Sequence, residues 1–255
     1  MIKNHWALGY VEEVMNGLVY QPSGVCPHQC WSETNVIHPA ITGMIGWKPH
    51  ALQNRVELEP RFPLHWDNVT VNNLGIGNSR LKLEMKRFQR KTAYVLSLQQ
   101  GRSVTVNLFP EIPDGMIIEK IYVNDQPVTL STERYRGLLK HPIVFKLNSK
   151  TTVILKHKNG VGMIPVMPRP EPGDVSKGYR IIDARLKGKT YIVDLEGKSG
   201  TEGKFAVRVF DQRVKKIKGG KTVSTSKNGI VNFSVPFPES KKKFVKKQIV
   251  VFLTE

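Results

Sequence analysis

Two neighbouring carboxylates near the start of the chain are the first side chains that could do chemistry. Glu12 and Glu13 lie in the segment Gly9-Tyr10-Val11-Glu12-Glu13-Val14-Met15-Asn16-Gly17. A positioned carboxylate can serve as a general base. Adjacent glutamates on a short helix are more commonly solvent-facing, so both interpretations stay open at this point.

Gln29 and Trp31 form a second candidate group. The amide of Gln29 can exchange hydrogen bonds with hydroxyl groups, and the indole of Trp31 can stack on an apolar ring face such as that of a pyranose. The alternative is that both residues pack at the start of a helix.

The two cysteines of the chain, Cys26 and Cys30, flank His28. Two cysteines do not make a disulfide framework, and a structural zinc site needs four ligands. We therefore predict buried free thiols at Cys26 and Cys30, and we expect neither a metal nor another cofactor.

A helix is predicted to follow these residues. The apolar residues after Trp31 recur at intervals of three and four, with Ser32 near the start, a bend at Pro39 and Gly46 near the end. A second short helix is predicted over residues 6–15. One helical hairpin cannot bury its own apolar face, so we expect a partner: missing upstream sequence, a second copy or the rest of the chain.

From about Ala51 the period changes to two-residue alternation, which predicts short strands and a β-sandwich. The predicted strands lie around residues 56–58, 69–71, 81–85, 94–98, 104–108, 117–123 and 153–155. Asn124 to Pro127 is predicted as a turn. We assign Trp66 as an anchor of the sandwich core and Trp47 to the close of the helix.

The segment Met163 to Pro172 contains four prolines, which is typical of a linker. Five further strands are predicted beyond it, around residues 179–182, 190–195, 205–209, 230–233 and 249–252. The expected organisation is a helical unit at 1–52, a β-sandwich at 53–170, and a second β-rich unit or added sheet layer at 171–255.

The net charge of +18 raises the question of a nucleic-acid partner. Basic residues concentrate at Arg213 to Lys218 and at Lys241 to Lys243 with Lys246 and Lys247, and we interpret both clusters as exposed loops. No nucleic-acid-binding motif accompanies them, so we favour a solvated surface over a nucleic-acid patch. No apolar run reaches membrane-spanning length, and Met1 to Trp6 lacks the features of a secretory signal. The protein is expected to be cytoplasmic if Met1 is the natural start.

Several segments together resemble debranching-type amylo-1,6-glucosidases, which are six-hairpin glycosidases. They are the segment containing Glu13 and Asn16-Gly17, and Gly24-Val25-Cys26-Pro27-His28-Gln29-Cys30-Trp31-Ser32, which is similar to the family's Gln-x-Trp-Ser. Val56 to Pro63, Trp66 to Val69 and Gly77 to Leu81 are similar to the first sandwich segments after the family's barrel. The resemblance extends to about residue 170 and more weakly to the end.

The resemblance implies a mainly β chain in which β-sandwich regions follow the last helical hairpin of an (α/α)6 barrel. It implies a carbohydrate substrate, with Glu13 as the general base and Gln29 and Trp31 in the sugar site, and it leaves the choice between inverting and retaining hydrolysis open. The general acid would lie in missing barrel sequence, so the chain alone is expected to have little activity. The rival hypothesis is a non-catalytic β-sandwich module for carbohydrate contact or domain assembly.

Overall fold

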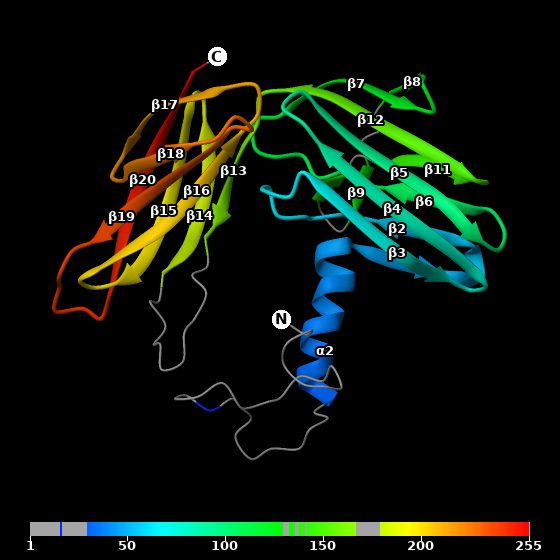
Figure 1. Ribbon diagram of the computed structural model, residues 1–255, viewed down its shortest axis with the longest axis horizontal. Coiled ribbons are helices and arrows are strands. Elements are labelled where there is room, and N and C mark those ends of the chain that lie inside the picture. Colours follow the sequence, from blue (N-terminus) through cyan, green and yellow to red (C-terminus); the bar gives the residue numbers. More distant parts are fainter. Residues whose placement is uncertain are drawn as a thin grey trace.

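The computed structural model of this 255-residue chain describes residue 16 and residues 30–129, 133–135, 138–140, 142–166 and 179–254. The described part is mainly β: two β-sandwiches stand side by side, and one helical segment runs away from them (Figure 1). The predicted mainly-β sandwich class is confirmed. The helix predicted over residues 6–15 lies outside the described residues. Among the described residues, no helix has the length and apolar character needed to cross a membrane.

The helical segment consists of α2 (Cys30–His38) and the π-helix η1 (Pro39–Ile45). Pro39 cannot donate a backbone hydrogen bond, so the irregularity predicted there takes the form of a change from α-helix to π-helix. Gly46 ends the segment with a φ of 68°. An added Cβ at Gly46 would lie 1.9 Å from the carbonyl oxygen of Glu59. Only glycine therefore fits where the helix joins the first sandwich.

The first sandwich has a four-stranded sheet in the order β1-β2-β6-β11 and a six-stranded sheet in the order β3-β4-β5-β12-β7-β8. β2 pairs with β6 in parallel, and the other pairs are antiparallel. A 3-10 turn, η2 (Ala51–Gln53), joins β1 to β2, and the short hairpin β9 (Glu133–Tyr135) and β10 (Leu138–Lys140) lies apart from both sheets. The strands of the two sheets are β1 (Trp47–His50), β2 (Arg55–Leu58), β3 (Asn68–Ile76), β4 (Ser79–Arg87), β5 (Lys91–Gln100), β6 (Val104–Leu108), β7 (Ile117–Val123), β8 (Gln126–Val128), β11 (Ile143–Leu147) and β12 (Lys150–Lys158).

Alternation of side chains builds the core of the first sandwich. On β4 the side chains of Leu81, Leu83 and Met85 are buried, while those between them face outward. Full burial of a side chain of this size contributes about 1.5–3 kcal/mol. Trp47 is also buried, and its indole Nε1 donates a hydrogen bond of 3.2 Å to the carbonyl of Gly75. Trp47 is thus a core anchor. The assignment of Trp66 as that anchor is wrong, because its side chain is 38% exposed.

The second sandwich has two four-stranded sheets, in the orders β13-β16-β19-β18 and β14-β15-β20-β17. The strands are β13 (Val161–Pro165), β14 (Arg180–Lys187), β15 (Thr190–Lys198), β16 (Thr201–Val209), β17 (Arg213–Lys218), β18 (Lys221–Thr225), β19 (Ile230–Phe237) and β20 (Phe244–Thr254). Its core is aromatic-rich: Phe205 and Phe233 stack with ring centroids 6.0 Å apart. The five strands predicted after residue 171 are all present.

The chain passes from the first sandwich to the second between β12 and β13. Strand β13 lies on the N-terminal side of residue 170, yet it pairs with β16 of the second sandwich, for example Val161 opposite Val209. The expected division into units at 52 and 170 stays a prediction. By strand pairing alone, however, the second sandwich begins at Val161.

Two predictions about the basic and sulfur-containing residues are wrong. Arg213 to Lys218 is not a loop but the edge strand β17, in which Ile217 faces the core at 7% exposure. The thiol of Cys30 is not buried but exposed on α2. Lys241 to Lys243 does lie outside the strands, as predicted, but Lys246 and Lys247 belong to strand β20 and not to a loop.

Candidate functional site

The three site residues predicted from sequence fall at the helical end of the chain. Glu13 and Gln29 lie outside the described residues, so their geometry stays a prediction. Trp31 is the second residue of α2 and its side chain is 56% exposed. An indole so exposed is available for stacking on a ligand.

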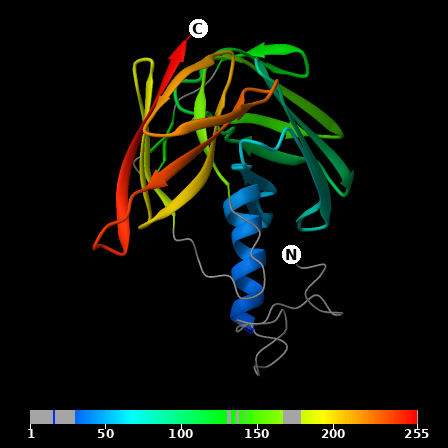
Figure 2. The ribbon, with the colours of Figure 1, turned by 60° about the vertical axis from the view of Figure 1, so that its left-hand side comes forward.

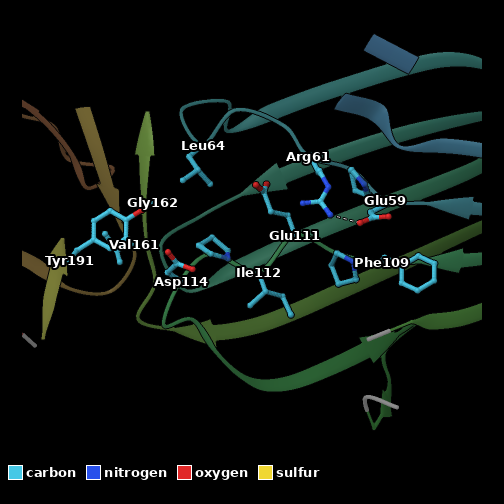
Figure 3. A pocket seen from close by; sticks show the side chains of 13 residues that line it. Glu59, Arg61, Leu64, Phe109, Glu111, Ile112, Asp114, Val161, Gly162 and Tyr191 are labelled. Atoms are coloured by element: carbon cyan, nitrogen blue, oxygen red, sulfur yellow. Dashed lines mark hydrogen bonds and ion pairs between the residues drawn. The ribbon is translucent and has the colours of Figure 1, made fainter. Parts of the chain in front are cut away.

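A cavity of about 460 Å³ opens between the two sandwiches (Figure 3). Two proline-rich loops form one wall: residues 59–64 follow β2, and residues 109–114 follow β6. Strands β13 and β15 of the second sandwich supply Val161, Gly162 and Tyr191. The residues that line the cavity are Glu59, Pro60, Arg61, Leu64, Phe109, Pro110, Glu111, Ile112, Pro113, Asp114, Val161, Gly162 and Tyr191.

An ion pair between Arg87 and Glu111 lies behind the wall formed by the two proline-rich loops. The guanidinium Nη2 of Arg87, at the end of β4, is 3.0 Å from Oε2 of Glu111, and Nη1 donates to the carbonyls of Pro63 and Trp66 at 3.1 and 3.3 Å. Arg87 is 6% exposed. Burial raises the pKa of the Glu111 carboxyl, and the nearby Arg87 charge opposes that rise. Arg87 therefore fixes both proline-rich loops relative to β4.

A second carboxyl group lies three residues farther along the same loop. The backbone carbonyl of Asp114 accepts a hydrogen bond of 2.9 Å from the N–H of Val161, which joins the loop to the second sandwich. Partial burial, with the charge of Asp183 as a second cause, raises the pKa of Asp114. Burial, together with the Asp114 charge, raises the pKa of Tyr191 to about 12. The phenol of Tyr191 thus stays neutral at physiological pH.

A buried arginine holds the two sandwiches together beside this cavity. Arg208 on β16 is 1% exposed, and its Nη1 donates to Oδ1 of Asp67 and to the carbonyl of Leu64, both at 2.5 Å. Asn228 reaches the other oxygen of Asp67, with Nδ2 to Oδ2 at 3.0 Å. Burial lowers the pKa of Arg208, and its bond to Asp67 opposes that. The Asp67 carboxylate is therefore the shared acceptor of the junction.

A fully buried histidine lies at the same junction. Nε2 of His157 shares a hydrogen bond of 3.1 Å with the hydroxyl of Thr92, and its ring meets that of Phe210 edge-on at 5.8 Å. Within the described residues, Nδ1 has no hydrogen-bond partner. Burial is the main cause that lowers the pKa of His157 to about 4, with the Arg87 charge next. His157 is therefore neutral at physiological pH.

The junction residues were not found by the sequence analysis. Pro110-Glu111-Ile112-Pro113-Asp114-Gly115 did carry a signal, because prolines flanking a glutamate between two strands mark a shaped loop. Nothing in the sequence indicated that Arg87, Arg208 and His157 are buried together. Among the described residues, no group of histidine, cysteine and carboxylate side chains could hold a metal ion.

Two solved glycoside hydrolase structures are similar to parts of this chain. No family model and no curated protein match the chain. One similar solved structure is a GH127 beta-L-arabinofuranosidase from Geobacillus stearothermophilus T6, with 11% identity over 87% of this chain and 34% of that chain, and a TM-score of 0.33. Another is described as a glycoside hydrolase, with 13% identity over 78% of this chain and 35% of that chain, and a TM-score of 0.31.

The chain spans about a third of the length of each of these two structures. Both of them are glycoside hydrolases, but TM-scores at this level do not establish a common fold. The properties of the site therefore rest on the residues of this chain.

Proposed function

We propose that this chain is the C-terminal part of a glycoside hydrolase that acts on an α-linked glucan or a related glycan. In this proposal the double sandwich is a rigid support, and it carries a helical end that completes a barrel of helical hairpins. Glu13 is the general base, and Gln29 and Trp31 contact the sugar. The general acid is supplied by the rest of the barrel.

The observation that carries the proposal is the exposed helical segment. None of the residues of η1 is buried, and the apolar side chains of Trp31, Val36, Ile37 and Ile41 are 56%, 38%, 54% and 39% exposed. A helix that leaves such side chains in water is normally packed against another element. Helices from the rest of the barrel would cover this face.

The attachment of the helix supports the same interpretation. Met44 and Ile45 pack against the first core, and the carbonyls of Met44 and Gly46 accept hydrogen bonds from the N–H groups of Arg61 and Glu59 at 2.8 and 3.0 Å. Only the last turn of the segment is thus held by the sandwich. Everything before it projects away, as expected for a segment shared with another unit (Figure 1).

Hydrolysis of aryl glycosides and branched α-glucans tests the catalytic role. The chain is expected to hydrolyse them weakly or not at all, because acid–base assistance contributes about 10²–10⁴-fold and one partner is missing. Any hydrolysis that is detected should fall in Glu13→Gln and persist in Glu12→Gln, the matched control one residue away. Hydrolysis that Glu13→Gln leaves unchanged would contradict the role of Glu13.

A second candidate function is glycan contact at the cavity between the sandwiches. Its proline rings, Phe109 and Leu64 offer an apolar wall, and Asp114 offers carboxylate oxygens that can accept bonds from sugar hydroxyls. Titration with mono- and disaccharides should show binding that Asp114→Asn weakens and Asp125→Asn, at an exposed turn, does not. Equal effects of the two substitutions would exclude the cavity as a glycan site.

A further inference from the structure

Positive charge is concentrated in the second sandwich. Residues 179–254 contain 18 lysines and arginines against 6 aspartates and glutamates. Net charge of this density is a usual basis for attracting an anionic partner. The strand registers show where on the sandwich these side chains gather.

One face of the sheet β14-β15-β20-β17 points outward. Tyr191, Val193 and Leu195 of β15 and Ile249, Val251 and Leu253 of β20 point into the core, so the residues between them point to the other face. In Figure 2, β20 forms the far left side of the molecule, with the first sandwich on the right. The first sandwich therefore leaves this face uncovered.

Two neighbouring rows of this face have the same layout. In one row, Lys216 lies opposite Phe252, Phe252 opposite Thr190, and Thr190 opposite Lys187. In the next row the order is Lys218, Val250, Ile192 and Arg185.

The middle of these two rows, on β20 and β15, thus consists of three apolar residues and Thr190. Basic residues of β17 and β14 border it on either side. The borders lie three strand spacings apart, or about 14 Å. We call these two rows the basic-bordered strip.

The lysines of the strip are available for a ligand. Within the described residues, the side chains of Lys187, Lys216 and Lys218 are exposed and make no hydrogen bond or ion pair. Arg185 differs, because its Nη1 is 2.6 Å from Asp194 and 2.5 Å from Asp183. Phe252 is 36% exposed at the centre of its row.

We propose that the basic-bordered strip binds a chain of an acidic polysaccharide, such as a polyuronate. The inference rests on the proposed carbohydrate partner and adds to it a second binding surface, one for a charged glycan. Pyranose rings present apolar C–H faces, which match Phe252, Val250 and Ile192. Their carboxylates lie at the ring edge, where Lys187, Lys216 and Lys218 can pair with them.

The same face is less suited to nucleic acid. Nucleic-acid strands bind through aromatic side chains that stack successive bases along a basic groove. Here only Phe252 lies within the two rows, and the next row contains Asp194, held by Gln248 with Nε2 to Oδ1 at 2.8 Å. The two rows therefore lack the series of aromatic side chains on which successive bases would stack.

Affinity electrophoresis of the intact chain in polygalacturonate gels tests the proposal. Retardation should weaken as salt rises, because exposed charges are screened over about 10 Å at 0.1 M. The triple variant Lys187→Gln, Lys216→Gln and Lys218→Gln should lose about tenfold in affinity, since three exposed ion pairs each contribute modestly. Its matched control is Lys86→Gln, Lys120→Gln and Lys150→Gln, the same change of charge at exposed lysines of the first sandwich.

A second variant and its control test the apolar part of the strip. Phe252→Ala should weaken binding, while Phe244→Ala, on the same strand and 42% exposed, should not. Both side chains are partly in water, so neither substitution is expected to unfold the protein. Far-UV circular dichroism of each variant checks that the sandwich is intact.

Four results of these experiments would overturn the proposal. The proposal is overturned by absence of binding at low salt, by equal losses in the two triple variants, or by equal retardation in a neutral glucan gel. It is also overturned if single-stranded DNA binds as tightly and the same lysines are needed, since the partner would then be nucleic acid. Glu13→Gln should bind polygalacturonate like the parent chain, so failure of the catalytic proposal would remain distinguishable from failure of this one.

Discussion

The two sandwiches bury the same kind of core and present different surfaces. In both, alternate side chains of antiparallel strands fill an apolar interior, with Leu83 in the first and Leu195 in the second completely buried. Outside, the second has 18 basic and 6 acidic residues over residues 179–254, whereas residues 46–160 have 18 and 9. The junction between them resembles neither surface nor core, because it buries Arg87, Arg208 and His157. Stability thus arises from the shared feature, and the proposed binding would depend on the difference.

Core truncation tests whether the two cores are coupled. Leu83→Ala and Leu195→Ala should each lower the free energy of unfolding by about 2–5 kcal/mol through a buried cavity. All four tryptophans lie at or before residue 66, and Trp47 is in the core of the first sandwich. A change in tryptophan fluorescence therefore does not arise from a tryptophan of the second sandwich, while circular dichroism reports both sandwiches. If the two sandwiches unfold together, Leu195→Ala should also shift the urea unfolding transition that tryptophan fluorescence follows. A shift seen only by circular dichroism would mean that the sandwiches unfold separately.

Replacing the buried Arg208 should uncouple the unfolding of the two sandwiches. Arg208→Met leaves Asp67 without its main cationic partner, and breaking a buried pair costs about 3–5 kcal/mol. We expect the lower end of this range, because the Asp67 side chain is 32% exposed and water can reach it. The single urea transition should split into two. Arg213→Met on the exposed edge of β17 is the control, and a split in that variant too would remove Arg208 from its role.

Acid should weaken the junction through His157. Its pKa falls from 6.5 to about 4 on folding, so the unfolded chain binds the extra proton between these values. Stability from this group is complete above pH 6.5 and is lost as the pH falls toward 4, by about 3 kcal/mol. Arg87 and Arg208 disfavour the charged ring, while Asp211 and Glu119 favour it.

The variant His157→Leu isolates this effect. It should be less stable at neutral pH, because Thr92 loses its partner, but its stability should fall less between pH 6.5 and 4. The carboxyl of Glu111 has a raised pKa and acts in the opposite direction, losing its contribution as the pH rises. It is present in both proteins and cancels in the comparison. His65→Leu, at an exposed site, should keep the full acid dependence of the parent.

The smallest effect on stability is expected at the helical end. Trp31→Ala should change the free energy of unfolding by no more than about 0.5 kcal/mol, because the side chain is mostly in water. Trp47→Ala, at 5% exposure, should lower it by about 3–5 kcal/mol. Thermal unfolding of the two variants checks this. A large loss in Trp31→Ala would mean that the helix is already covered within this chain.

Most of the longer strands could be predicted because a buried face imposes a period of two, whereas β1, β8, β11 and β13 were not predicted. Strand β13 overlaps the start of the segment predicted as a linker. Leu81, Leu83 and Met85 alternate with charged residues, and the structure buries those three. Strand β17 escaped prediction because it is an edge strand with a register shift between Val214 and Lys216, which breaks the alternation. Strand β18 escaped because all its residues are exposed.

The junction could not be predicted for a different reason. Arg208 and Asp67 are 141 residues apart in the sequence, and no local pattern connects them. The wrong assignment of Trp66 as the core anchor has the same origin, since burial of an indole depends on which loops cover it. Of the candidate site, only Trp31 could be located in the structure, and the roles of Glu13 and Gln29 stay predictions.

Calorimetric titration with branched α-glucan oligosaccharides tests the proposal that the helical end of this chain contacts a glycan. The parent chain should bind, and Trp31→Ala should bind about three- to tenfold more weakly, as expected for loss of one ring stack. Trp66→Ala, which removes another exposed indole, should bind like the parent. Absence of binding by the parent, or equal losses in the two variants, would contradict the claim.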